Sequence, residues 1–211
     1  MSLQACQLAC TRGGRSLFHG LDFTLQAGDA LRVAGANGSG KSSLLRLLCG
    51  LAFPSAGEVR WHGRNIRAAR EEFGAALTYL GHAHGVKDDL LAWENLVVAS
   101  TLAGQLVDRV QACTALAALG LGAQACLPAL SLSQGQRKRV ALARLHLQQD
   151  ARLWILDEPF AALDTATIAH LAGTLERHLE RGGMLVYTTH QHVPLRAPRA
   201  RLLDLSREAA C

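Results

Sequence analysis

The sequence has 211 residues, of which 49% are hydrophobic and 5% aromatic, so the chain is long and apolar enough for one domain with a full core. No apolar run approaches the roughly 18 residues of a membrane-spanning helix, and residues 1–6 lack a secretory pattern, so we expect a cytosolic chain without a membrane span. The net charge of +5 suits an anionic ligand or an anionic membrane surface, and it does not by itself indicate nucleic acid, which we do not expect as a partner.

Six cysteines stand at positions 6, 10, 49, 113, 126 and 211. None belongs to a C-x-x-C pair, and Cys49 falls within an expected helix. We therefore expect reduced thiols, and neither disulfides nor a metal site.

The first 80 residues have the pattern of short strands that are separated by glycine turns. The expected strands cover residues 3–8, 21–25, 30–34, 58–61 and 75–80. A helix is expected from residue 43 to 48, directly after the third strand and a glycine-rich loop. The glycine-rich loop therefore connects a strand to the N-terminus of a helix.

The loop contains G-x-x-x-x-G-K-S, the pattern of a phosphate-binding P-loop, and its flanks make a plain Gly/Ser surface turn a poor alternative. Its glycines allow successive N–H groups to turn inward at a helix N-terminus and to bind an anion. Lys41 would reach the β- and γ-phosphates, and the Ser42 hydroxyl would hold Mg²⁺. The expected nucleotide-binding residues of the loop are Gly35, Ala36, Asn37, Gly38, Ser39, Gly40, Lys41, Ser42 and Ser43.

Residues 94–119 are rich in Ala and Leu with sparse charges, which predicts two helices that are broken near Gly104. We expect a small helical subdomain over residues 84–134 within a single domain of residues 1–211. A further helix is expected over 135–149, with the basic run 137–139 on a solvated face. A strand at 153–156, a helix at 165–180, and strands at 184–188 and 202–205 follow. The alternation predicts an α/β fold with a mostly parallel core sheet after an N-terminal antiparallel part.

Four apolar residues lead directly into Asp157 and Glu158, and strand ends are where α/β sheets place catalytic groups. Asp157 can hold Mg²⁺. Glu158 would point the other way along an extended backbone and act as the general base toward water. A surface acidic pair is the alternative, but the buried type of the preceding residues speaks against it.

The segment Leu132-Ser133-Gln134-Gly135-Gln136 enters a helix and offers a second anion site, from a hydroxyl, a glycine N–H and a helix N-terminus. With these residues the chain resembles the ATP-binding cassette (ABC) family, a class of P-loop NTPases. The resemblance implies that Ser133, Gln134, Gly135 and Gln136 contact the ATP of a second subunit in a head-to-tail homodimer. It also implies that Asp164, in Ala162-Leu163-Asp164, belongs to the D-loop beside that ATP, and that His190, in Thr188-Thr189-His190, contacts the γ-phosphate.

Two positions depart from the family pattern. Arg12 stands where an aromatic residue usually stacks on adenine. His82 falls where the family has the Q-loop glutamine, so His82 either replaces that glutamine or merely faces a membrane subunit.

The segment Gly81–Gly85, the T-T-H-Q run from Thr188 and the G-L-D-F run from Gly20 are similar to the CcmA-type haem exporter subunits of cytochrome c maturation. This resemblance implies ATP and Mg²⁺ as cofactors, membrane permease subunits of CcmB or CcmC type as partners, and a peripheral place on the cytoplasmic face of the inner membrane. Haem would be the transported or released molecule and would not be bound by this chain.

The sequence is also compatible with other functions. The chain could power another ABC exporter, or be an ABC ATPase without a transport function, although such proteins usually carry two cassettes or long insertions. A P-loop kinase would leave the signature unexplained. A haem or metal site built from His82, His84, His190 and His192 is the less favoured interpretation of these histidines.

Overall fold

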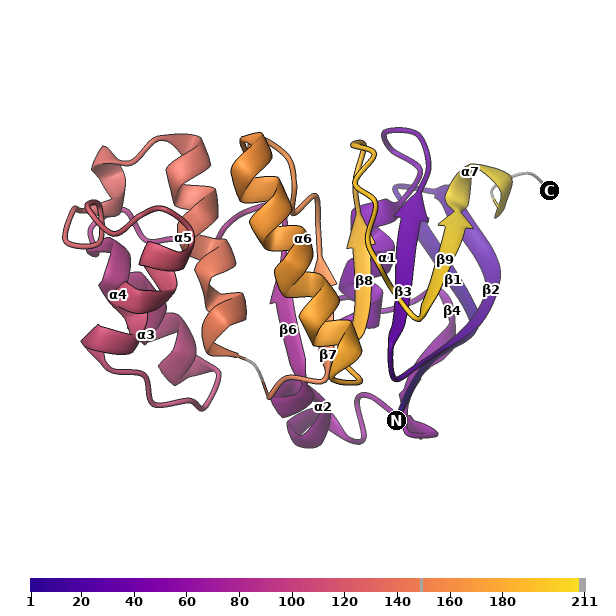
Figure 1. The fold of residues 1–211 in the computed structure, drawn as a ribbon. Helices are drawn as coiled ribbons and strands as arrows, with labels where there is room; N and C mark the ends of the chain where they lie inside the picture. Colours follow the sequence, from indigo (N-terminus) through magenta and orange to yellow (C-terminus); the bar gives the residue numbers. More distant parts are fainter. Residues whose placement is uncertain (149, 209–211) are drawn as a thin grey trace.

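The computed structural model describes residues 1–148 and 150–208, which form two β-sheets and a group of helices at one end (Figure 1). The larger sheet is parallel throughout, with the strand order β6-β7-β8-β3-β9. The smaller sheet is antiparallel, with the order β2-β1-β4-β5. The strands are β1 (Ser2–Arg12), β2 (Arg15–Gln26), β3 (Asp29–Ala34), β4 (Ala56–Trp61), β5 (Arg64–Asn65), β6 (Leu77–Leu80), β7 (Leu153–Leu156), β8 (Met184–Thr188) and β9 (Arg199–Asp204).

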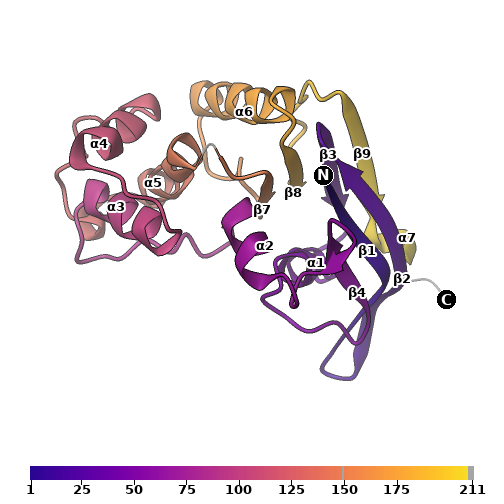
Figure 2. The same ribbon diagram turned by 90° about the horizontal axis from the view of Figure 1, so that it is seen from below.

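The helices cover both faces of the parallel sheet and extend it at one end. Helix α1 lies between the two sheets, and α6 covers the opposite face of the parallel sheet (Figure 2). Helices α3, α4 and α5 pack on one another beside β6 and β7, and we call these three helices the helical lobe. The helices are α1 (Lys41–Leu48), α2 (Arg70–Ala76), α3 (Ala92–Leu102), α4 (Arg109–Ala118), α5 (Gln134–Leu147), α6 (Thr165–Glu180) and α7 (Leu205–Glu208), with a 3-10 turn at Ala129–Ser131.

Strand β7 shows why the sheet has two buried faces. All four of its residues are buried, and they alternate between two apolar clusters. Trp154 and Leu156 pack toward α6 and the helical lobe, whereas Leu153 and Ile155 pack toward α1 and the antiparallel sheet. Side chains alternate along a strand, so an uninterrupted apolar run marks a strand that is covered on both sides.

The expected α/β architecture, with its antiparallel N-terminal part and helical segment, is confirmed, but several boundaries differ. Residues 75 and 76 were expected in a strand and instead end α2. The first turn of α2 carries Glu71 and Glu72, and negative charge at a helix N-terminus is stabilising. Leu205 was expected in the last strand and begins α7. Gln149, the expected end of the helix from residue 135, and Cys211 lie outside the described residues.

No helix in residues 1–148 and 150–208 combines the length and the apolar character that a bilayer span requires. The five cysteines within the described residues, Cys6, Cys10, Cys49, Cys113 and Cys126, are free thiols.

Candidate functional site

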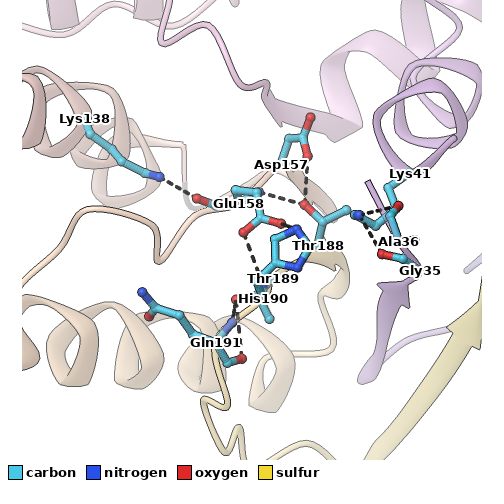
Figure 3. A network of polar contacts seen from close by, with 10 residues as sticks. All are labelled: Gly35, Ala36, Lys41, Lys138, Asp157, Glu158, Thr188, Thr189, His190 and Gln191. Atoms are coloured by element: carbon cyan, nitrogen blue, oxygen red, sulfur yellow. Dashed lines mark hydrogen bonds and ion pairs between the residues drawn. The ribbon is translucent and has the colours of Figure 1, made fainter. Parts of the chain in front are cut away.

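The carboxyl ends of four parallel strands meet at one edge of the sheet, and each is followed by candidate site residues. The P-loop follows β3, and His82 comes two residues after β6. Asp157 and Glu158 directly follow β7, and His190 comes shortly after β8. Parallel pairing therefore brings segments that are far apart in the sequence into one site (Figure 3).

The P-loop adopts a conformation that requires glycine at two positions. Gly35 and Gly40 have φ angles of 141° and 100°, in a region that other residues rarely adopt. A Cβ atom on Gly35 would lie 2.5 Å from Ser39 Oγ, and one on Gly40 would lie 3.1 Å from Leu17 Cβ. The loop passes so close to its neighbours that a side chain at either position would displace them, and this fixes the backbone that leads into α1.

Lys41 is the first residue of α1, and its ammonium group lies over the loop. It donates hydrogen bonds to the carbonyl oxygens of Gly35 at 2.8 Å and Ala36 at 3.1 Å. A lysine ammonium is a compact charge with three donors, so it can exchange these carbonyls for phosphate oxygens with little movement of its stem.

A cavity of about 620 Å³ opens over the P-loop, a size that suits a small-molecule ligand. It gathers residues from the hairpin after β1, the P-loop, the segment after β6, and the ends of β7 and β8. The lining residues are Arg12, Leu17, Asn37, Gly38, Gly40, Lys41, Ser42, Ser43, His82, Asp157, Glu158 and His190. Gly35 and Ala36 take part through the carbonyl groups that hold Lys41, and the Ser39 hydroxyl is buried inside the loop.

Asp157 and Ser42 line the same cavity and offer one carboxylate and one hydroxyl, both of the oxygen type that Mg²⁺ prefers. Asp157 is 7% exposed, and its Oδ1 accepts a hydrogen bond of 2.7 Å from Thr188 Oγ1, which fixes the carboxylate beside the loop. In residues 1–148 and 150–208, no group of three or more His, Cys, Asp or Glu side chains is arranged to hold a metal ion. The donor set therefore fits a metal that shares its coordination with phosphate oxygens and water.

Glu158 does not lie on an extended backbone as expected, because its φ angle is 52°, in the left-handed region. The turn is held by two contacts on its main chain: Thr188 Oγ1 accepts from the Glu158 N–H at 2.8 Å, and Lys138 Nζ donates to the Glu158 carbonyl. Such strained positions collect at functional sites, where surrounding contacts hold them.

The Glu158 carboxylate faces His190 across the cavity (Figure 3). His190 Nε2 lies 3.5 Å from Glu158 Oε1, and the His190 backbone N–H donates to Oε2 at 3.4 Å. The carboxylate is 17% exposed and the imidazole 59% exposed. A mostly buried carboxylate that retains access to the cavity is suited to orient and deprotonate a water molecule.

Two residues that shape this site, Thr188 and Lys138, were given no role from the sequence. Thr188 ties Asp157 to the Glu158 backbone, and its sequence signals were its place at the end of a buried strand and near His190. Lys138 is 7% exposed and lies one helical turn after Gln134 on α5. Its burial lowers the pKa of the ammonium, although the nearby Glu158 and Asp157 partly offset this effect.

The expectation of a solvated face for residues 137–139 is wrong. Arg137 forms an ion pair with Asp88 at 2.8 Å, Lys138 is buried against Glu158, and Arg139 Nη1 donates to the Leu119 carbonyl at 3.4 Å. Three cations in a row are tolerated here because each meets a carboxylate or a carbonyl oxygen on a different neighbour. This part of the helix connects the helical lobe to the site.

The signature residues begin α5, and their polar groups cap it. The Ser133 side chain accepts from the Gln136 N–H at 3.2 Å, and the Gln136 side chain accepts from the Ser133 N–H at 2.8 Å, a reciprocal capping box. A Cβ atom on Gly135 would lie 3.2 Å from the Ala162 carbonyl oxygen. Asp164 is the N-cap of α6, and its Oδ1 accepts from the Thr167 N–H at 2.8 Å.

A second cavity of about 600 Å³ adjoins the first and shares His82, Asp157, Glu158 and His190 with it. It also contains Gln134 of the signature, whereas the P-loop lines the first cavity. His84 lines the second cavity as well, and its pKa is lowered by burial, with smaller contributions from Lys138 and His82. The remaining lining residues are Ala83, Gly85, Val86, Arg137, Lys138, Ala161 and Ala162.

A P-loop, a buried strand that ends in Asp-Glu, and a capped helix that begins at an S-Q-G-Q segment together define an ATP-binding cassette. Solved structures share this fold: a putative ABC transporter ATP-binding protein from Pyrococcus furiosus superposes with a TM-score of 0.83 at 20% identity, covering 99% of both chains. A dimeric bacterial ABC transporter cassette gives 0.82 at 22% identity, covering 96% of this chain and 94% of that one. The family described as ABC transporter matches residues 18–161.

Relatives with much higher identity span the whole chain. A cytochrome c biogenesis ATP-binding export protein CcmA from Nitrosospira multiformis is 51% identical over 205 residues, covering 97% of this chain and 99% of the relative. The protein of the same name from Aromatoleum aromaticum is 52% identical over 208 residues, covering 99% and 97%. The chain belongs to the ABC transporter family and, within it, to the CcmA family. It is therefore an ATP-hydrolysing subunit of the ABC type.

Proposed function

We propose that this chain powers the export or release of haem for the biogenesis of c-type cytochromes. The observation that carries the proposal is the match over nearly the full length to CcmA proteins at 51% and 52% identity, since their name gives both the pathway and the export. The chain would work on the cytoplasmic face of the inner membrane, bound peripherally to permease subunits of CcmB or CcmC type. Haem would be contacted by those subunits and not by this chain.

The residues of the first cavity take defined roles in this proposal. Lys41 and the backbone of the P-loop bind the phosphates of ATP, while Ser42 and Asp157 hold Mg²⁺, which neutralises phosphate charge when bound. Glu158 orients and deprotonates the attacking water, and His190 contacts the γ-phosphate. The geometry that supports these roles is the shared cavity and the short distance between Glu158 and His190.

ATP would also join two copies of the chain. In a head-to-tail homodimer, Ser133, Gln134, Gly135 and Gln136 of one copy reach the ATP on the P-loop of the other, with Asp164 beside it. The placement of Gln134 in a cavity next to the P-loop cavity, and not within it, supports a role toward a second copy. A related cassette of the same fold has been solved as a dimer in a post-hydrolysis state with ADP and Pi.

His82 would report the nucleotide to the membrane subunits in place of a glutamine. It lines both cavities, so it lies between the P-loop and the segment that continues to α3. We further propose that residues 1–211 act as one cassette domain whose segment 84–134 is a helical subdomain. One apolar cluster extends from α3 and α4 through α5 to the parallel sheet, which supports a single cooperative unit.

The experiment that tests the function is complementation of a bacterial strain that lacks its own CcmA. Wild-type protein and Lys87→Ala, a change at an exposed lysine, should restore haem-stained c-type cytochromes, whereas Lys41→Ala should not. Affinity purification of the wild-type chain from membranes should recover the permease subunits. Recovery of the permease of a different exporter, with no restored cytochrome, would instead identify the chain as the ATPase of that exporter.

A further inference from the structure

Two half-buried histidines contact each other across the neighbouring helices α5 and α6. Neither histidine lines the two cavities of the nucleotide site. Figures 1 and 2 show the two helices side by side. His146 lies near the C-terminal end of α5, and His170 lies in the first half of α6. Their Nε2 atoms are 3.4 Å apart, their ring centres are 5.3 Å apart, and the ring planes are inclined by 33°. None of the roles given above uses this pair.

The distances match two imidazoles that point at one ion. With a zinc–nitrogen bond of about 2.05 Å, nitrogens 3.4 Å apart subtend an angle of about 112° at the metal, close to tetrahedral. Because a ring nitrogen lies about 1.15 Å from the ring centre, the two ring centres would then be about 5.3 Å apart, as observed. A straight N–H···N hydrogen bond of the same length would place the ring centres about 5.7 Å apart.

An imidazole binds a metal only in its neutral form. Burial lowers the pKa of His146, and the neighbouring His170 and Arg177 lower it further, which favours that form. Arg177 lies on α6 with His170, and its Nη2 donates to Thr174 Oγ1 at 3.0 Å. The same guanidinium would repel a bound cation, so it sets a limit on the affinity.

An ion and its water ligands can reach His146 from an open cavity. His146 lines a cavity of about 670 Å³ between α4 and the end of α5, together with Asp150, whose carboxylate adds negative charge there. Across the part of the chain that the structure describes, no third His, Cys, Asp or Glu groups with the two histidines. Water would therefore complete the coordination, as in an exchangeable site.

We propose that His146 and His170 form a binding site for one divalent transition-metal ion of the zinc class, which bridges α5 and α6. Imidazole ligands favour Zn²⁺ and its neighbours over Mg²⁺, so the site would not compete for the ion of the nucleotide site. The bridge would join the helix that Ser133 caps to the helix that Asp164 caps. A bound ion would therefore fix the spacing of two segments that are proposed to meet the ATP of a second copy.

The test is a titration of the nucleotide-free full chain with Zn²⁺ alone at pH 7.5, in competition with a coloured chelator. Wild-type protein should bind one Zn²⁺. The affinity of His146→Asn and of His170→Asn for Zn²⁺ should be at least about tenfold lower, because loss of a residue that only supports a metal ligand already costs that much. His19→Asn, a change at an exposed histidine of β2, is the matched control and should bind as wild type does. Any Zn²⁺ bound by cysteine thiols would be the same in the wild type and all variants, so it would not affect the difference between them.

A second variant guards against misfolding of the histidine variants. Arg177→Met removes the repelling charge and should tighten Zn²⁺ binding, whereas a structural pair of histidines would give no such change. Thermal unfolding without metal checks that each variant is folded. Equal Zn²⁺ binding by the wild type and both histidine variants, or an Arg177→Met protein that binds no more tightly than wild type, would overturn the proposal.

Discussion

Arg12 stands at the end of β1, before the Gly13-Gly14 turn, and lines the P-loop cavity beside Leu17. A guanidinium plane can stack on a purine, but it offers less apolar contact than an aromatic ring and does not by itself distinguish one purine from another. We therefore expect GTP to bind within about a hundredfold of ATP, a difference below roughly 2.7 kcal/mol, in competition with a fluorescent nucleotide. Arg12→Tyr should tighten both nucleotides together.

A preference for ATP above that limit would mean that another group reads the adenine edge. The comparison of wild type with Arg12→Tyr separates the two cases, because a tyrosine changes stacking and leaves any edge contact in place.

At the level of single residues, the P-loop and Asp157 could be predicted because their chemistry depends on local spacing. Lys138 and the left-handed turn at Glu158 could not, since both follow from contacts between α5 and the end of β7. A run of three basic residues on an expected helix carries no sign that its middle member will be buried. Which cation is buried depends on how the helical lobe packs against the sheet.

A substitution of Ser133, the N-cap of α5, can distinguish its role in stability from its proposed role toward ATP. Asp is as good an N-cap as Ser, so Ser133→Asp should keep the free energy of unfolding within about 1 kcal/mol of wild type. The added carboxylate would repel the γ-phosphate that the proposed dimer brings to this position, so ATPase activity should fall to the level of a Glu158→Gln protein. Urea unfolding and phosphate release measure the two effects.

Ser131→Asp, at an exposed serine just outside the capping box, is the control for added charge and should hydrolyse ATP normally. An active Ser133→Asp protein would remove the serine from any contact with nucleotide.

His178 on α6 makes the packing of this helix on the sheet sensitive to pH. It is 2% exposed, it stacks on Trp154 with ring centres 3.9 Å apart, and its Nε2 lies 3.1 Å from the Met184 carbonyl oxygen. Burial lowers its pKa to about 4, from about 6.5 in an unfolded chain. The unfolded state therefore binds more protons between these values, and stability that is present above pH 6.5 is lost as the pH falls toward 4.

The expected loss is on the order of 3 kcal/mol, and urea unfolding at pH 7.0 and 4.5 measures most of it. His178→Phe can still stack on Trp154 but cannot bind a proton, so its free energy of unfolding should fall less between the two pH values. His192→Asn, at an exposed histidine, should fall as much as wild type. Equal losses in wild type and His178→Phe would assign the acid sensitivity to other groups.

At the level of elements, buried strands such as β7 and β8 could be predicted because four or five apolar residues in a row leave few alternatives. Helix α2 was missed because only Phe73 of its seven residues is buried, so it has almost no apolar periodicity. Its position is set by its place before β6, and the first two residues of the expected strand became its last turn. The segment that holds α3 and α4 was predicted as helical, but its packing on α5 depends on tertiary contacts.

At the level of the whole molecule, apolar clusters on the two faces of the parallel sheet connect every layer. The P-loop extends from the side that α1 and the antiparallel sheet form, whereas the signature begins on the side of the helical lobe. A single copy therefore presents the P-loop and the signature on different sides of the parallel sheet. In the proposed homodimer, a second copy brings its signature to the P-loop of the first.

The most direct test of this central claim is the mass of the Glu158→Gln protein in solution with Mg²⁺ and ATP. Glutamine cannot accept the proton of the attacking water, so ATP should stay bound and hold two chains together. Light scattering should then give twice the 22.6 kDa of one chain, while the Lys41→Ala, Glu158→Gln double variant should stay monomeric. A Glu158→Gln protein that binds ATP with wild-type affinity and still scatters as a 22.6 kDa monomer would contradict the account.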